Sequence, residues 1–286
     1  MQGRYELKLV VDGATKQRFV DAIRDNVYAD PHGDNAVYRV SSLYFDSPDF
    51  RAYWEKLDGE SLRRKYRLRY YSVDEQSGSV QNGFMEIKHR VHNTVYKQRV
   101  ALTDQGAEAI LADDLELASL DRHALPKQEP GLVEQIQRHA TGQPLRAATV
   151  ITYLREAWMG NVDHRLRITF DSRCQAYQPA AFGQVGNNLG QPILPEHQCI
   201  MEIKFDHSIP CWIRDVLVDQ QLHLQRFSKY AAGVIQPACS ELQQLLNRHR
   251  QVRQGPTTTA ATPCAQKPLL PIGENAAPVV NPNAIT

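Results

Sequence analysis

Three basic residues stand at every second position of one short stretch, KYRLRYY, which covers residues 65–71. Side chains of a β-strand alternate between its two faces, so Lys65, Arg67 and Arg69 would share one face, opposite an apolar row. Like charges packed this closely cost free energy unless an anion lies opposite them. The stretch therefore predicts an anion-binding surface on a sheet.

The same alternation of charged and apolar residues recurs in five further stretches. Their charged positions are Arg4, Glu6 and Lys8; Glu86, Lys88 and Arg90; Lys97 and Arg99; Arg165 and Arg167; and Glu202 and Lys204. A sheet with one solvated face would explain any single stretch. A sheet closed on itself would instead gather the charged rows inside a barrel. That interior would match a polyphosphate, since guanidinium and ammonium groups both bind phosphate oxygens.

Carboxylates stand among these cations, and the pattern Glu-x-Lys occurs three times. Glu6, Glu86 and Glu202 cannot bind phosphate, but they could hold Mg²⁺ or Mn²⁺, which prefer hard oxygen ligands. The alternative is that they neutralise neighbouring lysines and arginines. The sequence leaves both roles open.

The elements that would position these residues are mostly strands in adjacent pairs joined by short turns. Strands are predicted over residues 4–11, 37–45, 65–73, 83–91, 94–102, 148–158, 164–172 and 199–206. Helices are predicted over residues 15–27, 103–114, 130–141, 212–222 and 227–250. Thr15 is the expected N-cap of the first helix, and Ser228 could cap the last. This order favours an antiparallel sheet or barrel decorated by helices.

Composition narrows the classes of protein that the chain could belong to. Among 286 residues the net charge is only +1, which excludes a globally basic nucleic-acid binder, so anion binding must come from local clustering. No stretch has the apolar length of a signal peptide or a membrane span. Five scattered cysteines without CxxC spacing indicate reduced thiols and a cytoplasmic location. Residues 254–286 are expected to form a flexible tail after one folded domain, residues 1–253.

Several of these stretches, taken in order, resemble the VTC domain. This is the polyphosphate-polymerase domain of the vacuolar transporter chaperone complex, within the triphosphate tunnel metalloenzyme superfamily. The matching pieces are RYELK, SSLYFDSPDFRAYWEKL, RLRYY, MEIKHR, YLREAW to RLRITFD, MEIKF and RFSKYAAG, spread over about residues 3–240. The resemblance implies an α+β fold whose core is an eight-stranded antiparallel β-barrel, the triphosphate tunnel, with helices packed on its outside.

The resemblance also implies which residues hold the substrate. Carried over by position, the phosphate-contacting residues would be Lys8, Arg67, Arg69, Lys88, Tyr153, Arg155, Arg167, Ser228 and Lys229. The metal ligand would be Glu202. Lys56, Arg90 and Arg226 stand where eukaryotic members carry arginine, histidine and lysine, so the positive charge is kept or increased there. Lys97, Arg99 and Lys204 join the substrate-binding set through the alternation alone.

The implied activity is a metal-dependent phosphoryl transfer that elongates polyphosphate from ATP. Mn²⁺ or Mg²⁺ would be the cofactor, and the ligands would be ATP and inorganic polyphosphate or pyrophosphate, with no nucleic acid. Arg67, Arg69, Arg155, Arg167 and Lys88 would be the catalytic clamp, and no protein nucleophile is needed. Eukaryotic complex subunits also have a phosphate-sensing domain and membrane segments, for which this sequence has no counterpart. Translocation of the product would therefore need a membrane-protein partner.

Two other functions fit the same residues. One is a tunnel triphosphatase or adenylate cyclase. These relatives typically carry a stricter ExExK near the N-terminus, whereas Arg4 stands here in place of the first glutamate. The other is a non-catalytic module that binds polyphosphate or inositol polyphosphate. Metal-dependent consumption of ATP would separate this module from both enzymes.

Overall fold

The computed structural model describes residues 3–32, 36–72, 83–102, 144–182 and 190–236, with isolated positions at 131, 134, 135, 138, 142 and 242. Within this part of the chain, eight strands form one antiparallel path in the order β1-β10-β8-β7-β3-β4-β5-β6. Their bounds are β1 (Tyr5–Asp12), β10 (Gln198–Phe205), β8 (Arg167–Tyr177), β7 (Arg146–Gly160), β3 (Val37–Asp46), β4 (Leu62–Ser72), β5 (Phe84–Val91) and β6 (Thr94–Ala101). Two short strands, β2 (Val27–Ala29) and β9 (Gln191–Pro192), pair with β7 and β8.

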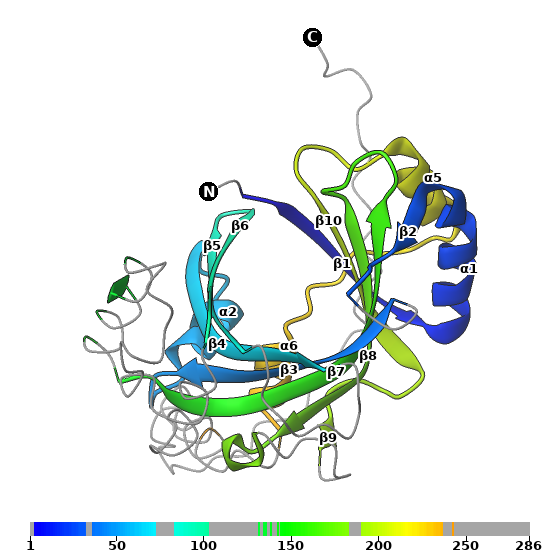
Figure 1. Cartoon of the computed structure of the whole chain (residues 1–286). Helices are drawn as coiled ribbons and strands as arrows, with labels where there is room; N and C mark the ends of the chain where they lie inside the picture. The colour runs from blue at the N-terminus through cyan, green and yellow to red at the C-terminus, as the bar shows by residue number, and fades with distance from the viewer. Residues whose placement is uncertain are drawn as a thin grey trace, which may run out of the picture.

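The path of strands curls until its two edge strands meet, which gives the ring seen in Figure 1. Arg4, just before β1, forms a bridge with Val95 of β6 through two backbone hydrogen bonds of 3.2 and 3.3 Å. Farther along β1, the Lys8 carbonyl accepts a hydrogen bond from the Gln225 amide at 2.8 Å instead. The predicted antiparallel barrel is therefore confirmed, and its seam is a single bridge rather than a continuous ladder.

Strand register decides which charged residues face one another. Lys8 lies opposite Glu202, and Arg67 lies opposite both Glu86 and Tyr44. Apolar residues alternate with these charged ones and point outward. On β4 and β5 they form a buried cluster that includes Leu68, Met85 and Ile87. The period of two read from the sequence thus separates a charged interior from an apolar exterior.

Two helices cover the outside of β1, β10 and β8, as Figure 1 shows at its right-hand side. They are α1 (Gly13–Ile23) and α5 (Cys211–Asp219), and Phe19 and Ile213 pack with Leu9 of β1. The prediction that Thr15 caps the first helix is wrong. β1 runs directly into α1, and Asp12 is the N-cap, its side chain accepting a 2.7 Å hydrogen bond from the Thr15 amide.

Two shorter helices, α2 (Arg51–Leu57) and α6 (Lys229–Val234), lie at the end of β3. Asp46, the last residue of β3, accepts hydrogen bonds from the backbone amides of Ser47 and Ala52 and from the Tyr230 hydroxyl. This buried carboxylate therefore joins β3, α2 and α6. Two 3₁₀ helices, η1 (Arg24–Asn26) and η4 (Pro179–Ala181), are also present.

All eight predicted long strands are confirmed, with ends that differ by a few residues. The sequence did not predict α2, β2 or β9, which are too short to show a period. The predicted helices at 103–114 and 130–141, most of 235–250 and the tail at 254–286 lie outside the described residues. In the part that is described, no helix combines the length and apolarity needed to cross a bilayer.

Candidate functional site

A cavity of about 910 Å³ lies inside the barrel. Twelve lysines and arginines line it, against three glutamates, which gives the lining a formal charge of +9. The cations are Lys8, Lys56, Arg63, Lys65, Arg67, Arg69, Lys88, Arg90, Arg155, Lys204, Arg226 and Lys229. The glutamates are Glu6, Glu60 and Glu202. The near-neutral charge of the whole chain thus conceals a strongly basic interior.

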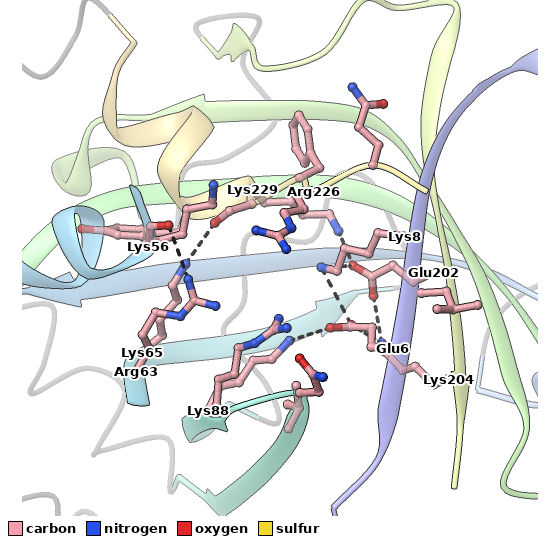
Figure 2. A pocket seen from close by; sticks show the side chains of 18 of the residues that line it. Glu6, Lys8, Lys56, Arg63, Lys65, Lys88, Glu202, Lys204, Arg226 and Lys229 are labelled. Atoms are coloured by element: carbon pink, nitrogen blue, oxygen red, sulfur yellow. Dashed lines mark hydrogen bonds and ion pairs between the residues drawn. The ribbon is translucent and has the colours of Figure 1, made fainter. Parts of the chain in front are cut away.

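Segments far apart in the sequence supply these side chains, which converge in Figure 2. Lys8 comes from β1, Lys65 from β4, Lys88 from β5 and Glu202 from β10. Lys229 enters from the first turn of α6, where the Ser228 hydroxyl caps the helix by accepting from the Ala231 amide at 3.3 Å. The expected capping role of Ser228 is therefore confirmed.

Glu202 is the centre of an ion-pair network within the cavity. Its carboxylate lies 2.8 Å from Lys204 Nζ, 3.0 Å from Lys8 Nζ and 3.0 Å from Lys229 Nζ. Burial pushes the pKa of Glu202 up, but these three ammonium groups outweigh it and hold the pKa well below its ordinary value. Glu202 is therefore ionised at neutral pH.

Glu6 is the second carboxylate in this network. It lies 3.1 Å from Lys88 Nζ, 3.7 Å from Lys204 Nζ and 3.8 Å from Lys8 Nζ. Burial raises the pKa of Glu6, but the charges of Lys8 and Lys88 outweigh it and lower the pKa to about 2. Glu6 and Glu202 share Lys8 and Lys204 as partners, so the two carboxylates lie close together.

Whether this donor set fits a divalent cation can be judged from its oxygens. Glu6 and Glu202 are ionised and offer the hard ligands that Mg²⁺ and Mn²⁺ prefer. However, no cluster of three or more metal-ligating side chains exists among the described residues. The pair fits an ion that draws most of its ligands from phosphate and water, as Mg²⁺ does in many phosphate sites.

Glu86 occupies a different place from the one expected for a metal ligand. It is fully buried and does not line the cavity. Its carboxylate lies 2.6 Å from Arg67 Nη2, 3.1 Å from Lys97 Nζ and 3.7 Å from Arg69 Nη1. Burial raises its pKa, but the two arginines outweigh it and lower the pKa. The geometry supports the alternative role of Glu86, which is to neutralise these cations.

The floor of the cavity is built from buried arginines with fixed partners. Arg155 donates two 2.7 Å hydrogen bonds to Asp171, and Arg69 donates to the Tyr153 hydroxyl at 3.1 Å. Lys229 Nζ lies 2.5 Å from the same Asp171. Asp171 is not among the predicted site residues, although it stands in phase with Arg167 on β8. Bidentate pairing of this kind fixes the orientation of a guanidinium plane.

Besides Glu86, three predicted site residues do not line the cavity. Arg167 donates to the Asp30 carboxylate at 2.5 Å and to the Tyr38 hydroxyl at 2.7 Å. Lys97 is held by Glu86, and the Arg99 guanidinium lies over the Phe84 ring at 4.7 Å. All three lie on the charged face of their strands, outside the lining set.

The structure also adds residues that were not carried over from the VTC domain, although the alternation had already placed Lys65 on the anion-binding face. Lys65 lies inside the cavity, where its Nζ donates to Ser228 Oγ at 2.9 Å. Arg63 lines the same cavity, and the Tyr44 hydroxyl accepts from Arg67 at 3.1 Å. The alternation along β4 marks both Arg63 and Lys65, because they continue the series that ends at Arg69.

Solved structures with similar folds come from several organisms. A putative adenylyl cyclase from Hippeastrum, described as having a dominant triphosphatase activity, is 14% identical and has a TM-score of 0.49; the match covers 83% of this chain and 99% of that one. A putative adenylate cyclase from Bacillus halodurans is 12% identical and has a TM-score of 0.46; the match covers 79% of this chain and 94% of that one. A protein from Pyrococcus horikoshii is 12% identical and has a TM-score of 0.40; the match covers 80% of this chain and 96% of that one.

No curated protein gives a significant match. A family model does: the one that describes the VTC domain matches residues 3–236. This match covers well over half of the chain and includes every strand and helix that contributes to the cavity. The chain therefore belongs to the VTC domain family.

Proposed function

We propose that this chain is a polyphosphate polymerase, which transfers the γ-phosphate of ATP to a growing chain of inorganic polyphosphate inside the barrel. The observation that carries the proposal is the cavity lining, with twelve cations against three glutamates in a VTC domain. A linear polyanion offsets such a charge along its whole length, which a single carboxylate or phosphate ligand cannot do.

The reaction asks the protein mainly for positioning and charge stabilisation. A terminal oxygen of the polyphosphate chain attacks the γ-phosphorus of ATP, the bond from this phosphorus to the β,γ-bridging oxygen breaks, and ADP leaves. Arg67, Arg69 and Arg155 would clamp non-bridging oxygens, and their buried partners hold them in place. Lys8 and Lys229 would add point charges.

A divalent cation bound to the phosphates would offset the charge that develops on the leaving group. Glu202, assisted by Glu6, would hold that cation, because both carboxylates line the cavity and are ionised. Arg167, Lys97 and Arg99 stay predicted phosphate ligands that would first have to leave their present partners.

The side chain of Arg4 favours transfer to phosphate over a two-metal hydrolysis. Its guanidinium lies 3.5 Å from Asp206 and donates to the Arg165 carbonyl. Position 4 therefore supplies no carboxylate beside Glu6 and Glu202, the two lining glutamates that share lysine partners, and this pair would hold one metal ion.

The test is to incubate the protein with ATP and Mn²⁺ and to resolve the phosphate products by length on a gel. We expect a ladder of long chains with a matching release of ADP. Arg69→Ala should lower the rate by about 100-fold or more, because a charge stabiliser of the transition state is lost. Glu202→Ala should also abolish the ladder. Arg214→Ala is the control, since this exposed arginine of α5 does not line the cavity and pairs with Asp215 on the surface.

Two outcomes would contradict the proposal. Orthophosphate as the sole product would identify a tunnel hydrolase. Binding of ATP or polyphosphate without any consumption of ATP would identify a binding module.

A further inference from the structure

Lys65 differs from the other deep lysines of the cavity in its partners. Lys8, Lys88, Lys204 and Lys229 each lie within 2.5–3.1 Å of a carboxylate oxygen of Glu6, Asp171 or Glu202. Lys65 has no ion-pair partner among the described residues. Its Nζ donates to Ser228 Oγ at 2.9 Å and lies over the Tyr230 ring, 4.9 Å from the centroid.

The groups that face Lys65 are mostly of its own charge. Lys88 lies opposite it in the β4–β5 register, while Lys8 faces it from β1 and Arg63 from β4 itself. Asp46 of β3 is the carboxylate that raises the pKa of Lys65 most, and the Tyr230 hydroxyl and backbone amides already occupy that group. Burial, and then the charges of Lys88, Lys8 and Arg63, hold the pKa of Lys65 well below its ordinary value.

The neighbouring hydroxyl of Ser228 can also donate a hydrogen bond to a phosphate. Ser228 Oγ accepts from the Ala231 amide and from Lys65, so its own proton is free to be donated to a phosphate oxygen. An ammonium group at Lys65 would have three protons, one for Ser228 and two for the same phosphate. Lys65 and Ser228 thus form a part of the cavity wall that offers hydrogen-bond donors and holds no ion-paired carboxylate.

We propose that Lys65 Nζ and Ser228 Oγ form a docking subsite for one phosphate group of the polyanion, and that Lys65 takes up a proton from solvent when this phosphate binds. The inference deepens the proposed function and rests on it. The amine becomes an ammonium group, and no other bond changes. Because protons are bound with the ligand, affinity falls as the pH rises between the pKa of Lys65 in the free protein and its higher pKa in the complex.

The experiment is calorimetric titration of the full chain with inorganic tripolyphosphate, without metal, in two buffers of different ionisation enthalpy at the same pH. The difference in heat measures proton uptake, which we expect to reach up to about one proton per chain. Lys65→Arg should still bind tripolyphosphate but lose most of this uptake, because a guanidinium is always charged. Lys65→Gln should lose the same uptake and bind about tenfold more weakly, a loss of about 1.4 kcal/mol.

Lys8→Arg is the matched control for this substitution. Burial lowers the pKa of Lys8, but Glu202 and Glu6 outweigh it and raise the pKa, so Lys8 is charged before the ligand arrives. Proton uptake should therefore be the same in Lys8→Arg as in the wild type. Burial lowers the pKa of Lys88 to about 8, so Lys88 can also take up a fraction of a proton when phosphate binds. A small proton uptake that remains in Lys65→Arg is assigned to Lys88.

Two results would overturn this inference and leave the proposed function standing. One is tripolyphosphate binding by the wild type without proton uptake. The other is an uptake in Lys65→Arg equal to that of the wild type. A wild-type protein that does not bind tripolyphosphate at all would overturn both proposals.

Discussion

Buried charge is distributed unevenly among the residues of the barrel. Glu86 is enclosed by Arg67, Lys97 and Arg69 and has no access to the cavity, whereas Glu202 faces it. An enclosed carboxylate of this kind holds arginines in position, and removing it leaves their charges unpaired in the interior. Glu86 is therefore a supporting residue, and its loss should lower the free energy of unfolding.

Glu86→Gln tests this distinction. We expect the free energy of unfolding to fall by about 3–5 kcal/mol, because Arg67 would lose its charged partner while staying buried. Urea denaturation measures the change. Glu55→Gln is the matched control, since Glu55 pairs with the exposed Arg51 on α2 and should cost no more than about 1 kcal/mol. Equal losses in the two variants would show that Glu86 does not support the arginines.

The sequence reveals the residues of this interior better than their partnerships. The alternation alone places Lys8, Arg67 and Glu202 on one charged face, and the structure gathers them. It cannot tell that Glu86 is enclosed or that Arg167 is held by Asp30, because both facts depend on which strands are neighbours and in which register.

Helix α6 is the element that completes the cavity wall. Gly233 of α6 lies against Ile151 of β7. Ile151 stands two residues before the cavity-lining Tyr153, and side chains two positions apart share one face of a strand. Helix α6 therefore packs on the inner side of β7 (Figure 1). A Cβ atom on Gly233 would lie 2.2 Å from Ile151 Cδ1. The absence of a side chain at this position therefore lets α6 approach β7 and present Ser228 and Lys229 to the cavity.

Gly233→Val should push α6 away from β7 although Gly233 does not line the cavity. We expect a loss of about 1–3 kcal/mol in stability from overpacking, and weaker binding of tripolyphosphate. Thermal melts and calorimetric titration measure the two effects. Gly13→Val is the matched control, because a Cβ there meets no atom within 4 Å and should change stability by at most about 0.5 kcal/mol. Unchanged binding in Gly233→Val would contradict this role of α6.

At the scale of elements, long periodic segments were predictable and short ones were not. The start of α6 is visible in the sequence, because Ser228 stands at the capping position before an apolar run. Its place inside the barrel is not visible, since the sequence does not tell which side of the sheet a helix covers. Helix α2 has only seven residues, too few to show a helical period of apolar residues. Its N-cap is Phe50, in the left-handed conformation, which makes no side-chain capping bond, so the sequence carries no signal for this helix.

The molecule as a whole carries a cavity whose charges repel one another when no anion is present. Tripolyphosphate at about 100 times its dissociation constant should therefore raise the free energy of unfolding by about 2.7 kcal/mol. A thermal melt with and without the ligand, at equal ionic strength set with NaCl, measures the shift. NaCl alone should give a much smaller stabilisation. A melting temperature that does not respond to tripolyphosphate would contradict a polyanion-binding interior.

The pairing of Lys8 with Glu202 joins residues 194 positions apart in the chain. During synthesis on the ribosome, the cationic strands β3 to β6 emerge long before β10 and α6 are made. Lys65, Arg67 and Arg69 therefore stay exposed to solvent until residues 198–229, which form the opposite side of the cavity, have left the ribosome. Contacts of such long range form slowly, so a nascent chain cannot enclose a polyanion in the barrel before its synthesis is nearly complete.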